Sequence, residues 1–191
     1  ANATDFGDLT VNRTSGALAS STRCVFGSGQ VSSGNSNVMD YVTIASAGNA
    51  TDFGDATVAR DTPAGTGTAT RGVFGGGTNV IDYITIASTG NATDFGDLHT
   101  TGTQTHGAHC SDTPAVQNEA DFAPAAIGLI AGANPTGNAA GMRTTIQYIN
   151  IASSGDAVMF GDLTQGSYNG AGVGSSTRAV FGIGATGGTD I

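Results

Sequence analysis

The chain has 191 residues but no lysine and no tryptophan, and it contains only two cysteines and four prolines. Six arginines face 15 acidic residues, which gives a formal net charge of −9. Nucleic-acid affinity rests on Lys and Arg neutralising phosphates, so this composition excludes a nucleic-acid partner. No segment approaches the roughly 18 consecutive apolar residues of a membrane-spanning helix, and none resembles a signal peptide. We therefore expect a soluble chain without membrane insertion.

Strong core formers are also scarce. With 31 glycines, 8 phenylalanines and no tryptophan, the chain would make a poor conventional core, so we expect each part to depend on its neighbours. The two cysteines, Cys24 and Cys110, add little information. The sequence leaves their pairing open, and a buried thiol is the favoured interpretation because cysteine packs as a small apolar residue.

What the sequence has in excess is repetition. The heptad Asn-Ala-Thr-Asp-Phe-Gly-Asp occurs three times unchanged, and a diverged fourth copy keeps Phe-Gly-Asp; the copies are Asn2–Asp8, Asn49–Asp55, Asn91–Asp97 and Asp156–Asp162. A period of roughly 40 to 50 residues indicates a repeat architecture. We divide the single array 1–191 into repeats 4–50, 51–92, 93–157 and 158–191, the last truncated. Because the chain begins and ends inside a repeat, we interpret it as an excerpt of a longer polypeptide.

The spacing of the aromatic residues indicates how each repeat folds. From the tyrosine of one repeat to the phenylalanine of the next heptad the interval is always 12, at Tyr41 and Phe53, Tyr83 and Phe95, and Tyr148 and Phe160. A constant interval across a Ser-x-Gly link is typical of a hairpin with a fixed turn.

We expect strands throughout, because Gly, Thr, Ser and Asn interrupt every candidate helical period. Four strands per repeat fit the pattern, and in the first repeat they are predicted at Ala17–Ser20, Arg23–Phe26, Tyr41–Ala45 and Thr51–Asp55. A β-solenoid is the structural rival. The glycine-linked hairpins favour antiparallel sheets over parallel solenoid coils.

These residues resemble the kelch repeat, with Phe where kelch repeats usually carry Trp. The likeness rests on an arginine after the aromatic strand (Arg13, Arg60), the strand Val73–Gly77, a tyrosine after a variable loop, and the aromatic residue 12 positions later. The first repeat departs at Gly27-Ser28-Gly29, and the fourth has Ser167 near the arginine position. The stretch Tyr83–Leu98 also resembles repeats of structural or tail-associated proteins of tailed bacteriophages, notably marine ones.

The resemblance implies an all-β fold, a kelch-like β-propeller or propeller-like array of four-stranded antiparallel blades. It also implies a location on a virion or outside the cell.

Paired carboxylates recur once per heptad, at Asp5, Asp8, Asp52, Asp55, Asp94 and Asp97. Hard oxygen ligands at this spacing suit Ca²⁺, so these residues are weak calcium candidates. Aspartate is also favoured in turns because its side chain accepts hydrogen bonds from nearby backbone amides, and this structural interpretation is the stronger one.

A second cluster, of potential metal ligands, lies in the third repeat: His99, His106, His109, Cys110 and Asp112. Its spacing matches no closed zinc motif, so we expect no metal and no cofactor.

No set of residues predicts catalysis. The Asp-Phe-Gly sequence would need a strand lysine to function as a kinase motif, and the chain has none. No Ser/His/Asp or Cys/His set recurs with a credible third partner, so we expect a protein that is not an enzyme. The Asn-Ala-Thr sequons are better explained by the hairpin turn than by glycosylation.

The main arginines fall at two repeat positions, Arg13 and Arg60 at one and Arg23, Arg71 and Arg178 at the other. We expect each to pair with a repeated aspartate between blades, since arginine binds carboxylate in a fork.

Function should lie where the repeats differ, in the variable segments Gln30–Asn37, Pro114–Pro124 and Ala133–Arg143. The binding candidates on these variable loops are Gln30, Asn35, Asn37, Glu119, Asp121, Phe122, Asn134 and Arg143. The first hypothesis is a non-enzymatic virion module of a tail, fibre or neck appendage. Its partners would be other virion proteins, copies of itself, or a host-surface glycan or protein. The alternative is a carbohydrate-binding, lectin-like propeller assisted by calcium.

Overall fold

The computed structural model describes residues 2–99, 106–111, 126–133, 142–167, 170–174 and 178–182. All regular elements in these ranges are β-strands, and the same ranges hold no helix long and apolar enough to cross a membrane. The strands are β1 (Ala17–Ala19), β2 (Arg23–Phe26), β3 (Gly29–Val31), β4 (Gly34–Thr43), β5 (Thr51–Arg60), β6 (Ala64–Gly67), β7 (Arg71–Gly75), β8 (Val80–Thr85), β9 (Thr93–Asp97), β10 (His106–Ser111), β11 (Ile127–Ala133), β12 (Arg143–Asn150), β13 (Val158–Asp162), β14 (Ala171–Gly174) and β15 (Ala179–Gly182).

The strands form separate antiparallel sheets, and the last strand of each of the first three sheets comes from the following repeat. Sheet 1 has the order β1-β2-β4-β3, with β5 paired to β4; sheet 2 is β6-β7-β8-β9; sheet 3 is β10-β11-β12-β13; and hairpin 4 is β14-β15. Every recorded pairing is antiparallel. The predicted all-β class and antiparallel pairing are therefore confirmed for the described residues, and a parallel solenoid does not describe them.

In the first repeat, the strands predicted at Ala17–Ser20 and Arg23–Phe26 match β1 and β2 to within one residue. The other two are longer than predicted. β4 begins seven residues before Tyr41 because β3 folds back on its first half, with Gln30 opposite Asn35. β5 then runs on to Arg60, since the extended β4 offers it a partner at Ser36.

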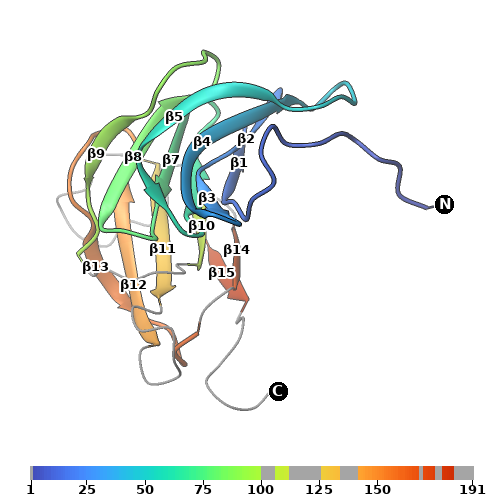
Figure 1. Cartoon of the computed structure of the whole chain (residues 1–191). Helices are drawn as coiled ribbons and strands as arrows, with labels where there is room; N and C mark the ends of the chain where they lie inside the picture. The colour runs from blue at the N-terminus through green and yellow to red at the C-terminus, as the bar shows by residue number, and fades with distance from the viewer. Residues whose placement is uncertain are drawn as a thin grey trace.

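The sheets follow one another with their first strands in contact. β1 lies against β6, β6 against β10, and β10 against β14. The last strands β5, β9 and β13 lie along the outside of the molecule (Figure 1). The described part of the chain is thus a row of sheets arranged side by side.

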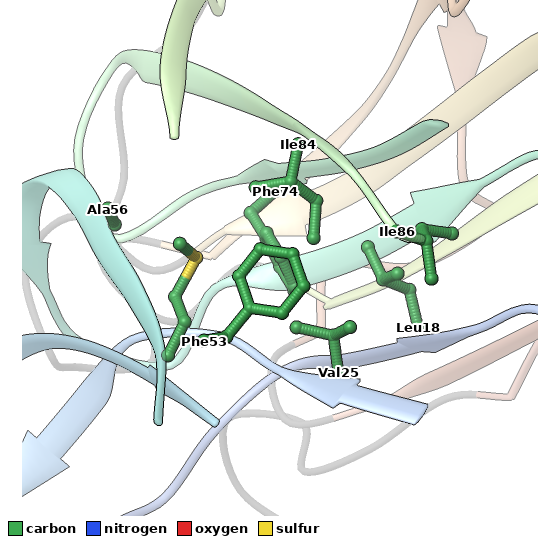
Figure 2. Packing of buried hydrophobic residues seen from close by; sticks show 8 residues of the cluster. Leu18, Val25, Phe53, Ala56, Phe74, Ile84 and Ile86 are labelled. Carbon is green, nitrogen blue, oxygen red and sulfur yellow. The ribbon is translucent and has the colours of Figure 1, made fainter. Parts of the chain in front are cut away.

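The hydrophobic core lies between the sheets. We call the side of a sheet that meets the next sheet its forward face, and the side that meets the previous sheet its rear face. In the first cluster the forward face of sheet 1 packs on the rear face of sheet 2, as Figure 2 shows. Its buried members are Leu18, Val25, Met39, Phe53 and Ala56 from sheet 1, and Phe74, Ile84 and Ile86 from sheet 2.

The second cluster repeats the first at the next joint. The forward face of sheet 2 contributes Val73, Ile81, Phe95 and Leu98, and the rear side of sheet 3 contributes Ile130, Ile149, Ile151 and Ala157. Burial of apolar area between neighbours is therefore the main source of stability, at roughly 25 cal/mol per Å². Each repeat depends on its neighbours, as in other repeat arrays.

The constant interval of 12 residues is explained by ring contacts within each sheet. Tyr41 and Phe53 meet edge to face, with ring centroids 6.0 Å apart. The equivalent pairs are Tyr83 with Phe95 at 6.1 Å and Tyr148 with Phe160 at 6.3 Å. Edge-to-face aromatic pairs are stabilising, so adding or removing one residue in this hairpin would break the pair.

Candidate functional site

The repeated heptad joins each sheet to the next. At the joint between sheets 1 and 2, Asn91 Oδ1 accepts a hydrogen bond from the Asp55 amide at 3.1 Å. The Gly90 amide donates to the Phe53 carbonyl at 2.7 Å, and the Ala92 amide donates to the Asp55 carbonyl at 2.8 Å. The same three bonds recur at the joint of Gly48–Ala50 with Phe6 and Asp8, and at that of Gly155–Ala157 with Phe95 and Asp97. The diverged copy keeps the contact because Asp156 Oδ1 accepts as Asn91 does.

The aspartate and glycine of the heptad shape the strand for this joint. The Asp52 carboxylate accepts the Gly54 amide two residues on, at 3.1 Å, and Asp5 does the same for Gly7. Gly54 has a φ of 134°, and a Cβ there would lie 2.5 Å from the Gly90 backbone. Only glycine adopts this φ without strain and leaves room for the next hairpin.

Two arginines also bridge the sheets, but their partners differ from the prediction. The guanidinium of Arg23 lies 4.5 Å from the Tyr41 ring centroid, and its Nη1 donates to the carbonyls of Ile86 and Ala87 in sheet 2. Arg71 repeats this pattern with Tyr83 and the carbonyls of Ile151 and Ala152.

The prediction that Arg23 and Arg71 pair with aspartates is therefore wrong. The neighbouring hairpin presents main-chain carbonyls to them, not carboxylates. Arg178, at the same repeat position, is exposed.

The other arginine position does pair with carboxylates. Arg13 Nη2 lies 2.8 Å from Asp40 Oδ2, and Arg60 forms the equivalent ion pair with Asp82 across the joint between sheets 1 and 2. All four side chains are fully buried. Thr57 also donates to Asp82. The prediction that these two arginines pair with aspartates is confirmed, but the partners lie directly before Tyr41 and Tyr83 and not in the heptad.

Burial raises the pKa of Asp82, while the charge of Arg60 and the hydrogen bonds from Thr57 oppose that rise. Burial also lowers the pKa of Arg60. Burial desolvates both ions, so each ion stabilises the other in this site. Removing one partner would leave an unpaired buried charge, which is strongly destabilising.

Sheet 3 replaces the ion pair by a neutral contact. Gln147 occupies the position of Asp82 before the tyrosine, it is buried, and its Oε1 accepts the His99 amide at 2.6 Å. The residues Asp40, Asp82 and Gln147 were missed by sequence reasoning. Their common place directly before Tyr41, Tyr83 and Tyr148 was the available signal.

The predicted binding residues of the first variable segment lie on the β3–β4 hairpin. Gln30 and Asn35 face each other across it and are exposed, whereas Asn37 is half-buried. The segment is thus a regular hairpin extending sheet 1 and not an irregular loop. Arg143 is exposed at the start of β12, opposite Ala133. Glu119, Asp121, Phe122 and Asn134, with the segment Pro114–Pro124, lie outside the described residues.

The predicted metal ligands are only partly described. The carboxylates of Asp5 and Asp52 accept local backbone amides, and Asp97 accepts from the Asn79 side chain at 3.1 Å. The part of the chain that the structure describes contains no group of three or more His, Cys, Asp or Glu side chains able to hold a metal ion. Asp112 lies outside it. The calcium hypothesis stays a prediction.

Cys24 is a free, half-buried thiol on β2, and burial raises its pKa. Its partial burial agrees with the favoured interpretation of a packed thiol. The raised pKa lowers the thiolate fraction and hence the reactivity.

These features define a repeat protein of antiparallel sheets, joined through their heptads and packed face to face. No family model matches the chain, and no curated protein matches it significantly. Among solved structures, 79 chains match its fold. One of them, described as the structure of YjhT, has a TM-score of 0.57 and 8% sequence identity, and the match covers 82% of this chain. The match spans 57% of that protein. At this identity the likeness concerns the fold alone.

Proposed function

We propose that the chain is a non-enzymatic, kelch-like β-propeller array in a tail, fibre or neck appendage of a tailed bacteriophage. In this role it scaffolds the appendage and presents its variable segments to the host surface. The propeller is supported by the row of antiparallel sheets with adjacent first strands and by the fold likeness to YjhT. The phage location rests on the resemblance of Tyr83–Leu98 to phage repeats.

One observation carries the non-enzymatic scaffold role. The polar groups of the heptad are engaged in joining sheets: Asn91 and the Asp55 main chain bind across the joint, and Asp52 binds its own turn. The most regular part of the sequence is therefore accounted for by structure. What differs between repeats, such as the β3–β4 hairpin with Gln30 and Asn35, is left for recognition. Many weak contacts from one array can add up to firm attachment.

The particle location is tested by mass spectrometry of phage particles purified by density gradient. We expect tryptic peptides of this chain at a fixed ratio to a capsid protein. Their loss after a second gradient, with the capsid peptides retained, would contradict a virion component.

The binding role is tested with the isolated chain on a glycan array and on host cells. We expect binding that the double variant Gln30→Ala, Asn35→Ala abolishes, because both side chains are exposed on one hairpin. Thr93→Ala is the matched control, because Thr93 is an exposed residue on the outer strand of sheet 2. Equal binding by both variants would remove the hairpin from the site. Binding to glycans that a calcium chelator abolishes would favour the lectin-like alternative and the heptad carboxylates.

A further inference from the structure

Among the residues that the structure describes, each end of the row of sheets has one packing face with no neighbouring sheet. Val180 on β15 occupies the position of Val73 in sheet 2, yet Val180 is 59% exposed and Val73 is fully buried. At the other end Ile44, just after β4, occupies the position of Ile86, and the exposed fractions are 45% and 1%. The difference within each pair comes from the neighbour, since the side chains are alike.

These two uncovered faces are of opposite kinds. Val180 belongs to a forward face, as Val73 does, and forward faces pack on the rear face of the next sheet. Ile44 belongs to a rear face, as Ile86 does. Within the described chain they do not cover each other, because both stay exposed. At the two internal joints a forward face packs on a rear face, so the face of Val180 and the face of Ile44 are complementary.

The outer strand of sheet 3, β13, also has no neighbour covering its forward face in the described residues. Phe160 is 63% exposed, whereas Phe95 at the same repeat position is 3% exposed. A Cβ at Gly161 would meet no atom within 4 Å, but at Gly96 it would meet the Gly155 backbone. Val158, on the same strand as Phe160, lies opposite Tyr148 and is 51% exposed. The surface that receives the next hairpin at the other joints is thus open here.

The N-terminal segment carries what this open surface receives elsewhere. Asn2 and Ala3 are the counterparts of Asn91 and Ala92, which bind the main chain of the previous heptad. By the same register, Asn2 of a second copy would accept from the Asp162 amide and Ala3 would donate to the Asp162 carbonyl. The rear face of sheet 1 of that copy would then lie over Val180.

We propose that the chain associates head to tail with a second copy of itself. The rear face of sheet 1 and the segment Asn2–Leu9 of one copy cover the forward face of β13 and hairpin 4 of another. The contact continues the interface already present between sheets 1 and 2 and between sheets 2 and 3. It is heterologous, so it generates longer assemblies or a ring. The described residues of the joint supply no counterpart of β8, so we expect weaker packing than at an internal joint.

Sedimentation velocity of the 191-residue chain tests the association from about 1 μM to about 1 mM, the range of weak dissociation constants. We expect the mean mass to rise with concentration and to pass that of a dimer. Val180→Asp and Ile44→Asp should each weaken self-association about tenfold or more, since a charge would be buried without a partner. Thr93→Asp adds the same charge on an outer strand away from both faces and should leave the association unchanged.

Mixing the two variants gives the decisive result. Val180→Asp keeps a working rear face, and Ile44→Asp keeps a working forward face. A head-to-tail contact therefore predicts that the mixture forms a 1:1 dimer that grows no further, at concentrations where each variant alone associates far more weakly. A wild-type monomer at all concentrations, or a mixture that stays monomeric, would overturn the proposal. Both substituted side chains are exposed, so unchanged circular dichroism verifies the fold. A monomeric chain would leave the test of particle location unaffected.

Discussion

Sheets 2 and 3 carry the same repeat but stand in different surroundings, and the comparison separates the effect of sequence from that of neighbours. Sheet 2 is covered on both faces, so Phe95 is buried and Gly96 lies against the next hairpin. In sheet 3 the corresponding Phe160 is exposed, and a Cβ added at Gly161 would meet no atom within 4 Å. The heptad motif is kept in both, yet its side chains are core residues in one and surface residues in the other.

The comparison shows that the same repeat position can be buried in one sheet and exposed in another. A phenylalanine at this position joins the core between two sheets only when the next repeat is present to cover it. Substitutions made at matched positions of the two sheets therefore measure the contribution of the joint itself.

The largest effect is expected at the buried ion pair that sheet 3 lacks. Asp82→Ala leaves the charge of Arg60 buried and unpaired, so the free energy of unfolding should fall by about 3–5 kcal/mol. The matched change Gln147→Ala loses a neutral hydrogen bond to His99 and should cost about 1–2 kcal/mol. Urea unfolding followed by circular dichroism measures both.

The double variant Arg60→Met, Asp82→Leu separates charge from packing. It removes both ions, so we expect it to recover most of the stability lost in Asp82→Ala. If the double variant is as unstable as Asp82→Ala, the loss of stability comes from altered packing and not from an unpaired charge.

The next effect is expected at the two phenylalanines. Phe95→Ala should lower the free energy of unfolding by about 3–5 kcal/mol, because it opens a cavity in the cluster between sheets 2 and 3. Phe160→Ala should cost below about 1 kcal/mol, since its ring is mostly exposed. The midpoints of urea unfolding compare the two variants. Equal losses would mean that Phe160 is covered in solution, as the head-to-tail association requires at high concentration.

A smaller difference is expected at the two glycines. Gly96→Ala would place a Cβ 2.5 Å from the Gly155 backbone at a φ of 147°, and should cost about 2–3 kcal/mol. Gly161→Ala meets no neighbour and should change the stability by less than about 0.5 kcal/mol. Thermal melts of both proteins at low concentration decide the matter, and a loss at Gly161 would contradict the open joint.

The smallest effect is expected at the first residue of the heptad. Asn91→Ala removes the acceptor for the Asp55 amide and should cost about 1 kcal/mol. Asn91→Asp should be close to neutral, because Asp156 makes the same contact in sheet 3. Hydrogen exchange of the Asp55 amide reads this bond directly, and faster exchange in Asn91→Asp would contradict the equivalence of the two side chains.

Much of the fold could be predicted from the sequence because the repeats encode it locally. The constant Tyr41–Phe53 interval predicted the hairpin that the ring contact explains. The extent of β4 and β5 could not be predicted, since it depends on β3 folding back onto β4. Sequence patterns within one strand do not report such a partner.

The candidate site was less accessible to sequence reasoning. The position of Asp82 before Tyr83 marks it as a repeated residue but not as a buried ion, because its burial depends on the approach of Arg60 from another sheet. Arg23 and Arg71 were assigned carboxylate partners on the basis of charge. Their true partners are main-chain carbonyls, which every residue carries and no sequence pattern marks.

The make-up of the heptad joint has a consequence for how such a gene can change in length. Each joint requires little more than main-chain groups, one Asn or Asp oxygen and one glycine, all supplied by the repeat itself. A duplicated unit therefore carries both the donor and the acceptor groups of the joint, and needs no compensating mutation in its neighbours. Recombination between identical heptads can lengthen or shorten the array by whole units, while the segments between them diverge independently.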